Sequence, residues 1–308
     1  MKALVYKSTG SWYQIRNEDG ELFNARIKGK FKIDGITSTN PLAVGDVVDF
    51  EKEDVAEGSV VINKIYPRGN YITRQSPHNK HLHHIIASNL DQSILLATLI
   101  DPKTSTGFLD RFLVASEAYH VPSIIVYNKS DLFTEKATEK FDEIKNIYEK
   151  IGYRVMLMSV SNNKGLQEVF DLLKGKTTLI SGHSGVGKSS FINTIFPGLS
   201  LKTQDVSEWS GKGLHTTTFA EMYDLPFGGR IIDTPGMREF ALMDIEPHEL
   251  SHYFPEMRQL INDCKFNNCM HIEEPGCAVK EAIEDGRVHA SRYINYLNIL
   301  GTIDKKKW

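Results

Sequence analysis

The sequence predicts a protein of three units: an all-β barrel, a central α/β domain with a parallel sheet, and a mainly α-helical C-terminal unit. Residues 1–70 read as short strands broken by Gly, Asn and Asp clusters. From about residue 90, apolar runs alternate with amphipathic helical stretches, which is typical of a parallel sheet covered on both faces. The last 60 residues hold all three cysteines. We therefore place the units at residues 1–70, 71–245 and 246–308.

Composition supports a globular protein and excludes several other classes. The chain has 308 residues, of which 41% are hydrophobic and 24% charged, so it is not disordered, collagenous or coiled-coil. It contains no run of 18 uncharged apolar residues, and its first residues lack the apolar core of a signal peptide. An odd number of cysteines argues against a secreted disulfide scaffold. We expect a cytoplasmic protein without membrane contact.

The N-terminal unit carries a candidate nucleic-acid surface. Five short strands in this length suggest an OB-fold, a small barrel that often binds nucleic acids. Alternate residues of a strand share one face, so the positive side chains Arg26, Lys28, Lys30 and Lys32 would lie together. The net charge of −3 for the whole chain hides this local excess. A solvated outer face remains the alternative interpretation of these four cations.

Residues 182–189 match the phosphate-binding pattern G-x-x-x-x-G-K-[ST]. The segment follows an apolar strand and opens a helix, which is the context that the motif requires. Glycines let backbone N–H groups surround phosphates, and the helix N-terminus adds partial positive charge. We expect Lys188 to reach the outer phosphates as a catalytic residue and the Ser189 hydroxyl to bind Mg²⁺. The expected nucleotide contacts are Gly182, Ser184, Gly185, Val186, Gly187, Lys188, Ser189 and Ser190.

A second motif indicates which base is bound. Asn128, Lys129 and Asp131 form N-K-x-D at the end of an apolar strand. A carboxylate at the last position accepts both the ring N–H and the exocyclic amine of guanine, which adenine cannot satisfy. A site of this kind discriminates by about 10⁴ or more. The strand that ends near Ser159 supplies a second base-contacting loop.

Residues further along the chain predict a Mg²⁺ site that responds to the third phosphate. Asp233 ends a strand and begins Asp-Thr-Pro-Gly, so it would hold Mg²⁺ while the Gly236 amide senses the third phosphate. Before it lies Gly-Leu-His-Thr-Thr-Thr at 213–218, where a threonine could complete the Mg²⁺ shell only in the triphosphate state. The alternative is that these threonines simply begin a β-strand, since residues 216–225 also read as one.

The group that activates water is less obvious. The position after Asp-Thr-Pro-Gly is Met237, and a thioether cannot orient an attacking water. His215, beside the threonines, is the best local candidate, because a neutral imidazole can orient water or relay a proton. A solvent-facing loop histidine is the alternative. Without a partner, hydrolysis should be slow.

The order of the motifs is itself informative. In an ordinary GTPase the phosphate loop comes first, whereas here the base-reading motif at 128–131 precedes the loop at 182–189, and Asp-Thr-Pro-Gly comes last. The central unit is therefore predicted to be a circularly permuted P-loop GTPase domain. Permutation is tolerated where termini lie close together at the surface. The C-terminal unit then follows directly on the segment that senses the third phosphate.

The three cysteines and one histidine predict a metal centre in the C-terminal unit. Cys264, Cys269, His271 and Cys277 form C-x4-C-x-H-x5-C. Three thiolates and one imidazole make a complete tetrahedral Zn²⁺ set with no open position, so the metal would be structural. Three unrelated buried thiols are the alternative.

Taken together, the motifs resemble the RsgA (YjeQ/YloQ) family of small ribosomal subunit biogenesis GTPases over essentially the whole chain. The resemblance rests on the barrel, Asn-Lys-Ser-Asp, Gly-His-Ser-Gly-Val-Gly-Lys-Ser-Ser, Gly-Leu-His-Thr-Thr-Thr, Asp-Thr-Pro-Gly-Met-Arg-Glu-Phe and the cysteine cluster, in that order. It implies a Mg²⁺-dependent enzyme that converts GTP to GDP and is stimulated by the small (30S) subunit late in its assembly. It also implies a catalytic role for His215 and assigns Mg²⁺ sensing to Thr217, with Ser189 and Asp233 as the other Mg²⁺ contacts.

The expected partners follow from the same resemblance: the 30S subunit and its 16S rRNA, not DNA, with the protein acting as a monomer. One alternative is a nucleotide-dependent RNA-binding adapter in which hydrolysis is not essential. Another is an ATP-using kinase, which the base-reading motif at 128–131 disfavours.

Overall fold

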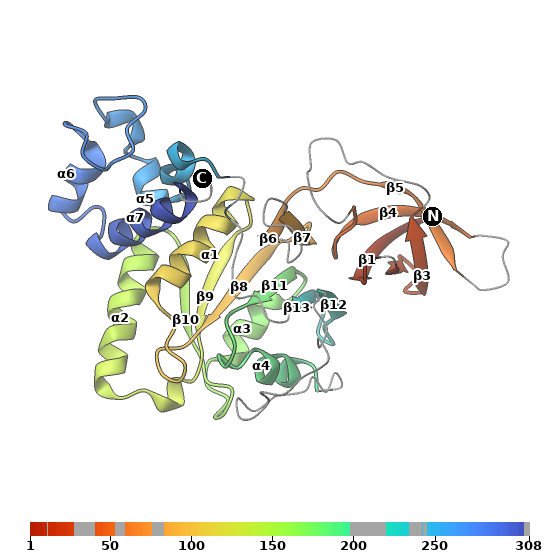
Figure 1. Cartoon of the computed structure of the whole chain (residues 1–308). Helices are drawn as coiled ribbons and strands as arrows, with labels where there is room; N and C mark the ends of the chain where they lie inside the picture. The colour runs from red at the N-terminus through yellow and green to blue at the C-terminus, as the bar shows by residue number, and fades with distance from the viewer. Residues whose placement is uncertain are drawn as a thin grey trace, which may run out of the picture.

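The computed structural model consists of a barrel, a central sheet with helices on both faces, and a C-terminal group of helices, in a row (Figure 1). The residues that the structure describes are 1–10, 12–27, 41–52, 59–75, 83–197, 220–233, 242 and 245–304. Within them, no helix has the length and apolar character needed to cross a bilayer. This arrangement confirms the predicted fold class, while the unit boundaries near residues 70 and 245 stay predictions.

The barrel contains five strands: β1 (Lys2–Ser8), β2 (Tyr13–Asn17), β3 (Leu22–Ile27), β4 (Val47–Lys52) and β5 (Val60–Ile65). They pair in the order β1-β2-β3-β5-β4, and pairing of β4 with β1 closes the barrel. Alternate residues point inward, so Val5, Ile15, Ala25, Phe50 and Ile62 are fully buried in its core. The predicted cationic strand, which begins at Arg26, overlaps the end of β3.

Arg26 is exposed on β3, but Lys28, Lys30 and Lys32 lie outside the described residues. A short hairpin, β6 (Tyr71–Gln75) and β7 (His83–Ser88), leads from the barrel to the central sheet.

The central sheet has six strands in the order β10-β9-β8-β11-β13-β12. Neighbours from β10 to β13 are parallel, and β12 is antiparallel to β13. The strand bounds are β8 (Gln92–Ala97), β9 (Ser123–Tyr127), β10 (Arg154–Leu157), β11 (Thr177–Ser181), β12 (Glu221–Asp224) and β13 (Arg230–Asp233). On β8, Leu95 faces the core shared with α1 and α2, whereas Ile94 and Leu96 face the core beneath α3 and α4. The carboxyl ends of the parallel strands meet at one edge, where a ligand is expected to bind.

The helices on the two faces are α1 (Thr106–Ala118) and α2 (Glu135–Lys150) on one side, with α3 (Leu166–Leu173) and α4 (Lys188–Ile195) on the other. A short helical turn, η1 (Ser130–Leu132), lies within the base-reading motif. Strand β12, the last strand of the central sheet, also pairs with β1 of the barrel. In the described residues, the barrel and the central sheet thus form one continuous sheet.

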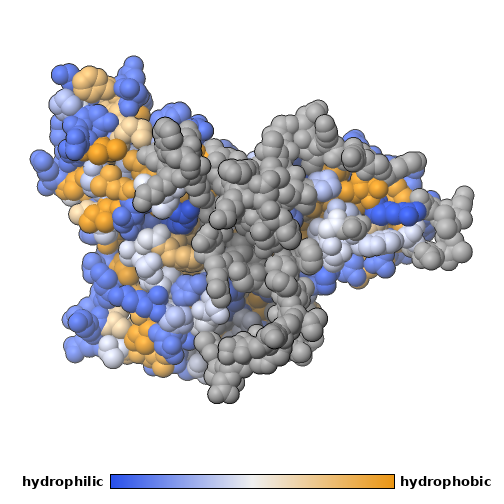
Figure 2. Space-filling view, in the orientation of Figure 1, coloured by the Kyte–Doolittle hydropathy of each residue, from blue (hydrophilic) through white to orange (hydrophobic). Residues whose placement is uncertain are grey.

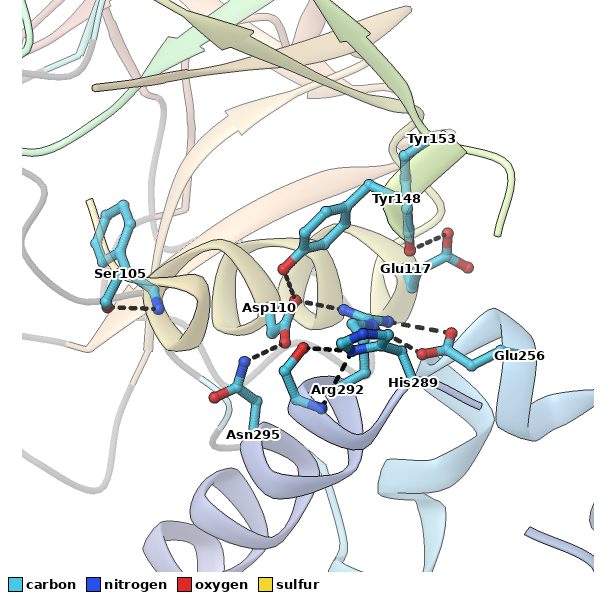
Figure 3. Close-up of polar contacts among 11 residues, drawn as sticks. Ser105, Asp110, Glu117, Tyr148, Tyr153, Glu256, His289, Arg292 and Asn295 are labelled. Atoms are coloured by element: carbon cyan, nitrogen blue, oxygen red, sulfur yellow. Dashed lines mark hydrogen bonds and ion pairs between the residues drawn. The ribbon is translucent and has the colours of Figure 1, made fainter. Parts of the chain in front are cut away.

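The C-terminal unit packs its last helix against α1 of the central domain. Its elements are η2 (Pro247–Tyr253), α5 (Pro255–Arg258), η3 (Ile261–Asp263), α6 (Ala278–Glu284) and α7 (Ala290–Asp304). Arg292 of α7 lies between Asp110 of α1 and Glu256 of α5 in the buried joint (Figure 3). Asn295 and Tyr148 donate further hydrogen bonds to Asp110 at 2.6 and 2.5 Å. Apolar patches are scattered among hydrophilic ones over the outer surface of this unit (Figure 2).

Candidate nucleotide site and metal centre

The phosphate loop runs from the end of β11 to the start of α4, as the sequence predicts. Gly182, Gly185 and Gly187 have φ values of 146°, 85° and 93°, which residues with a Cβ rarely adopt. A Cβ at Gly187 would lie 2.5 Å from Asn128 Nδ2, and one at Gly182 would lie 2.4 Å from the Leu96 carbonyl oxygen. The glycines thus serve both the turn and the close approach of neighbouring strands.

Lys188 folds back over this loop. Its Nζ donates hydrogen bonds to the carbonyl oxygens of Gly182 at 2.6 Å and His183 at 3.3 Å. Burial lowers the pKa of Lys188, and the charge of Asp233 partly offsets this by raising it. An ammonium group held above the loop in this way is placed to bind phosphate oxygens.

Asn128 ties the base-reading motif to two other loops. It is buried, with 2% of its surface exposed. Its Nδ2 donates to the Val186 carbonyl of the phosphate loop at 2.9 Å, and its Oδ1 accepts from the Val160 N–H at 3.2 Å. Next to it, Ser159 Oγ donates a hydrogen bond to the Asp131 carboxylate. Three segments far apart in the sequence therefore converge at one end of the sheet.

The loop after β8 also belongs to this site, although sequence reasoning did not single it out. Lys129 adopts a left-handed conformation with φ of 63°, and its Nζ donates to the Asp101 carbonyl. Thr104 Oγ1 lies 2.7 Å from His183 Nε2, and the Phe108 ring meets the His183 ring edge-on at 5.4 Å between centroids. This loop has no residue pattern that would mark it in the sequence.

The predicted Mg²⁺ contacts are only partly within the described residues. Asp233 ends β13, paired in register with Glu221 of β12 and Ile180 of β11. Ser189 and Ser190 lie in the first turn of α4. His215, Thr217 and Gly236 lie outside the described residues, so their assigned roles stay predictions.

The cysteine cluster gathers as the sequence predicts. The ligand atoms of Cys264, Cys269, His271 and Cys277 all lie within 4.8 Å of one another. His271 Nδ1 is 3.7 Å from Cys264 Sγ and 3.3 Å from Cys277 Sγ, spacings that suit the edges of a tetrahedron around Zn²⁺. Burial lowers the pKa of His271, which favours the neutral imidazole that a metal needs. The cluster is compatible with zinc.

The segment around the cluster is held by its own hydrogen bonds. The Glu274 carboxylate accepts from the N–H groups of Met270 at 2.7 Å and Ile272 at 2.8 Å. On the other side, Tyr293 and Tyr296 of α7 donate their hydroxyls to the carbonyls of His271 at 2.6 Å and Met270 at 2.8 Å. The metal-ligand loop is therefore attached directly to the helix that packs on the central domain.

Comparison with known proteins identifies the family. The family model described as "RsgA GTPase" matches residues 65–243, and "RsgA N-terminal domain" matches residues 2–60. The chain is 51% identical to the small ribosomal subunit biogenesis GTPase RsgA of Flavobacterium psychrophilum, over 97% of this chain and 92% of that protein. The chain belongs to the RsgA GTPase family.

Other RsgA proteins and solved structures agree. RsgA of Cytophaga hutchinsonii is 52% identical, with 97% of this chain and 98% of that protein covered. The crystal structure of YjeQ from Thermotoga maritima has a TM-score of 0.79 at 35% identity and covers 98% of both chains. YloQ, titled a circularly permuted GTPase, has a TM-score of 0.75 at 31% identity, covering 99% of this chain and 95% of that one.

Membership of the RsgA GTPase family makes this chain a GTP hydrolase, and it implies guanine nucleotide and Mg²⁺ as its ligands. The predicted circular permutation is confirmed by the strand order together with the YloQ likeness.

Proposed function

We propose that this protein hydrolyses GTP on the immature small ribosomal subunit and that subunit binding accelerates the reaction. The name shared by its relatives, small ribosomal subunit biogenesis GTPase, supports a partner of this kind. The observation that carries the enzymatic part is the convergence of three loops through Asn128, with Asp131 and Lys188 beside it. The proposed setting is a monomer that binds 16S rRNA, not DNA, in the cytoplasm.

Within the site, each residue has a proposed task. Asp131 accepts the two guanine donors, and Ser159 holds its carboxylate in place. Lys188 and the loop amides bind the phosphates, while Ser189, Thr217 and Asp233 surround Mg²⁺, which neutralises charge on the phosphates when bound. Gly236 senses the third phosphate. His215 orients the attacking water, a task that Met237 cannot perform.

The cysteine cluster has a proposed structural task. Cys264, Cys269, His271 and Cys277 would hold one Zn²⁺ in a closed site that stabilises the C-terminal unit. The chemistry of the donor set supports zinc over harder cations, because thiolates are soft ligands.

The decisive experiment measures GTP turnover with and without purified small subunits, for the wild type and for His215→Ala. Strong stimulation of the wild type that His215→Ala loses supports the proposal. Asp131→Ala serves as a second variant, since it should weaken GTP binding without touching the water-activating group. No stimulation of the wild type would favour the RNA-bound adapter instead.

A further inference from the structure

One row of residues crosses from the barrel to the nucleotide site. Lys7 of β1 pairs in register with Glu221 of β12, and Glu221 pairs in register with Asp233 of β13. Directly opposite residues on neighbouring strands point to the same face of a sheet. The Lys7 ammonium reaches the Glu221 carboxylate at 2.9 Å. Three charged side chains from three strands therefore lie in one row: the positive Lys7, then the negative Glu221 and Asp233.

The inner end of this row lies at the reaction centre. Asp233 is in register with Ile180 of β11, two residues before the phosphate loop begins at Gly182. Glu221 in turn follows Thr217 by four residues in the sequence. Strand β12 thus stands between the barrel and Asp233, one of the proposed Mg²⁺ contacts.

A second polar group fastens the other end of β12 to the barrel. The Tyr6 hydroxyl lies 2.8 and 2.9 Å from the two oxygens of the Asp224 carboxylate. Arg16 of β2 and Arg230 of β13 also bind this carboxylate. Asp224 therefore receives hydrogen bonds from the barrel on one side and from the central sheet on the other.

The ion pairs that join β12 to the barrel are partly solvated. The Lys7 and Glu221 side chains are each 28% exposed, and Asp224 is 36% exposed. A cavity of about 480 Å³ opens beside the Asp224 group, lined in part by Lys2, Arg16 and Arg230. Ion pairs with this exposure contribute little to stability. Such contacts can be rearranged when a partner moves the barrel.

We propose that strand β12 transmits the position of the barrel to the GTPase centre, with Tyr6 and Lys7 acting as positioning residues through Asp224 and Glu221. Binding of subunit RNA to the barrel would then shift Asp233 relative to the phosphate loop and change the rate of hydrolysis. The inference rests on the proposed stimulation by the small subunit and specifies its route. Both residues belong to strand β1 of the barrel, outside the phosphate loop and the base-reading motif.

The test uses the full chain with the double variant Tyr6→Phe/Lys7→Met, and measures turnover across a range of small-subunit concentrations. We expect the ratio of stimulated to basal turnover to fall about fivefold or more, the lower end of allosteric coupling. The subunit concentration that gives half-maximal stimulation should change less than about twofold, which is well below the roughly fivefold fall expected in the turnover ratio. The pair swap Lys7→Glu/Glu221→Lys should recover more stimulation than Lys7→Glu alone. Lys140→Met, which breaks an exposed pair on α2, is the matched control.

The outcomes separate the two claims. An unchanged ratio in the double variant, with the wild type stimulated, overturns the inference and leaves the proposed function intact. A shift in half-maximal concentration that accounts for the whole loss also overturns it, because Tyr6 and Lys7 would then serve only to bind the subunit. A wild type without stimulation contradicts the proposed function itself.

Discussion

The central sheet meets its two neighbouring units through joints of opposite character. At the C-terminal joint, Arg292 and its partners Asp110 and Glu256 are 1%, 0% and 4% exposed (Figure 3). At the barrel joint, the Lys7–Glu221 pair is 28% exposed on both sides. Both joints use ion pairs, but Arg292 and its partners are removed from water, whereas the Lys7–Glu221 pair is not.

Burial changes what an ion pair does. A buried charge that loses its partner has no water to replace it, so the C-terminal joint resists separation. A half-exposed pair exchanges its partner for water at little cost, so the barrel joint can adjust. The C-terminal unit is therefore held firmly on α1, whereas the barrel is attached to β12 by contacts that a binding partner can rearrange.

Removal of the metal should have the largest effect. If Zn²⁺ holds the cysteine cluster, its binding supplies about 10 kcal/mol or more of folding free energy. Chelation should unfold the loop around His271 and loosen α7, which is tied to that loop by Tyr293 and Tyr296. Hydrogen exchange should rise in residues 264–304 and stay unchanged in the barrel. Equal exchange with and without chelator would contradict a structural metal.

Arg292→Met should have the second-largest effect on stability. It leaves the carboxylates of Asp110 and Glu256 buried without their cation, which costs about 3–5 kcal/mol of unfolding free energy. Urea denaturation followed by tryptophan fluorescence would measure it. Arg258→Met is the matched control. Arg258 of the C-terminal unit also pairs with a residue of α1, Glu117, but its side chain is 51% exposed. Equal losses in both variants would show that burial does not distinguish them.

Asp224→Asn tests the stronger contact of the barrel joint. The amide keeps hydrogen-bonding capacity but loses the charge that attracts Arg16 and Arg230, so we expect a loss of about 1 kcal/mol. The same urea titration measures it, with Asp171→Asn on the exposed face of α3 as the control. A loss as large as that of Arg292→Met would mean that the barrel joint is as firm as the C-terminal one.

Lys7→Met should have the smallest effect on stability, below about 0.5 kcal/mol, because its pair with Glu221 is half-solvated. Its unfolding midpoint should match that of Lys140→Met within error. A clear destabilisation by Lys7→Met alone would make the barrel joint a structural support and weaken its proposed role as an adjustable contact.

The local features of the site were predictable because their residues are close in the chain. The phosphate loop needs glycines, a lysine and a serine at fixed spacing, so Gly182 and Lys188 are recognisable without any tertiary information. The cysteine cluster spans Cys264 to Cys277 and is read in the same way. The cationic face predicted from Arg26 to Lys32 stays a prediction, because Lys28, Lys30 and Lys32 lie outside the described residues.

The sequence by itself determined the three units, the permuted order of motifs, the Asn-Lys-Ser-Asp segment at 128–131 and the cysteine cluster. Only the tertiary structure decided which charges meet across long separations, such as Lys7 with Glu221, 214 residues apart, and Arg292 with Asp110, 182 residues apart. It also decided that Thr104 and Phe108 contact His183. The physical reason is that motif chemistry depends on neighbours fixed by covalent geometry, whereas these contacts depend on how sheets and helices pack.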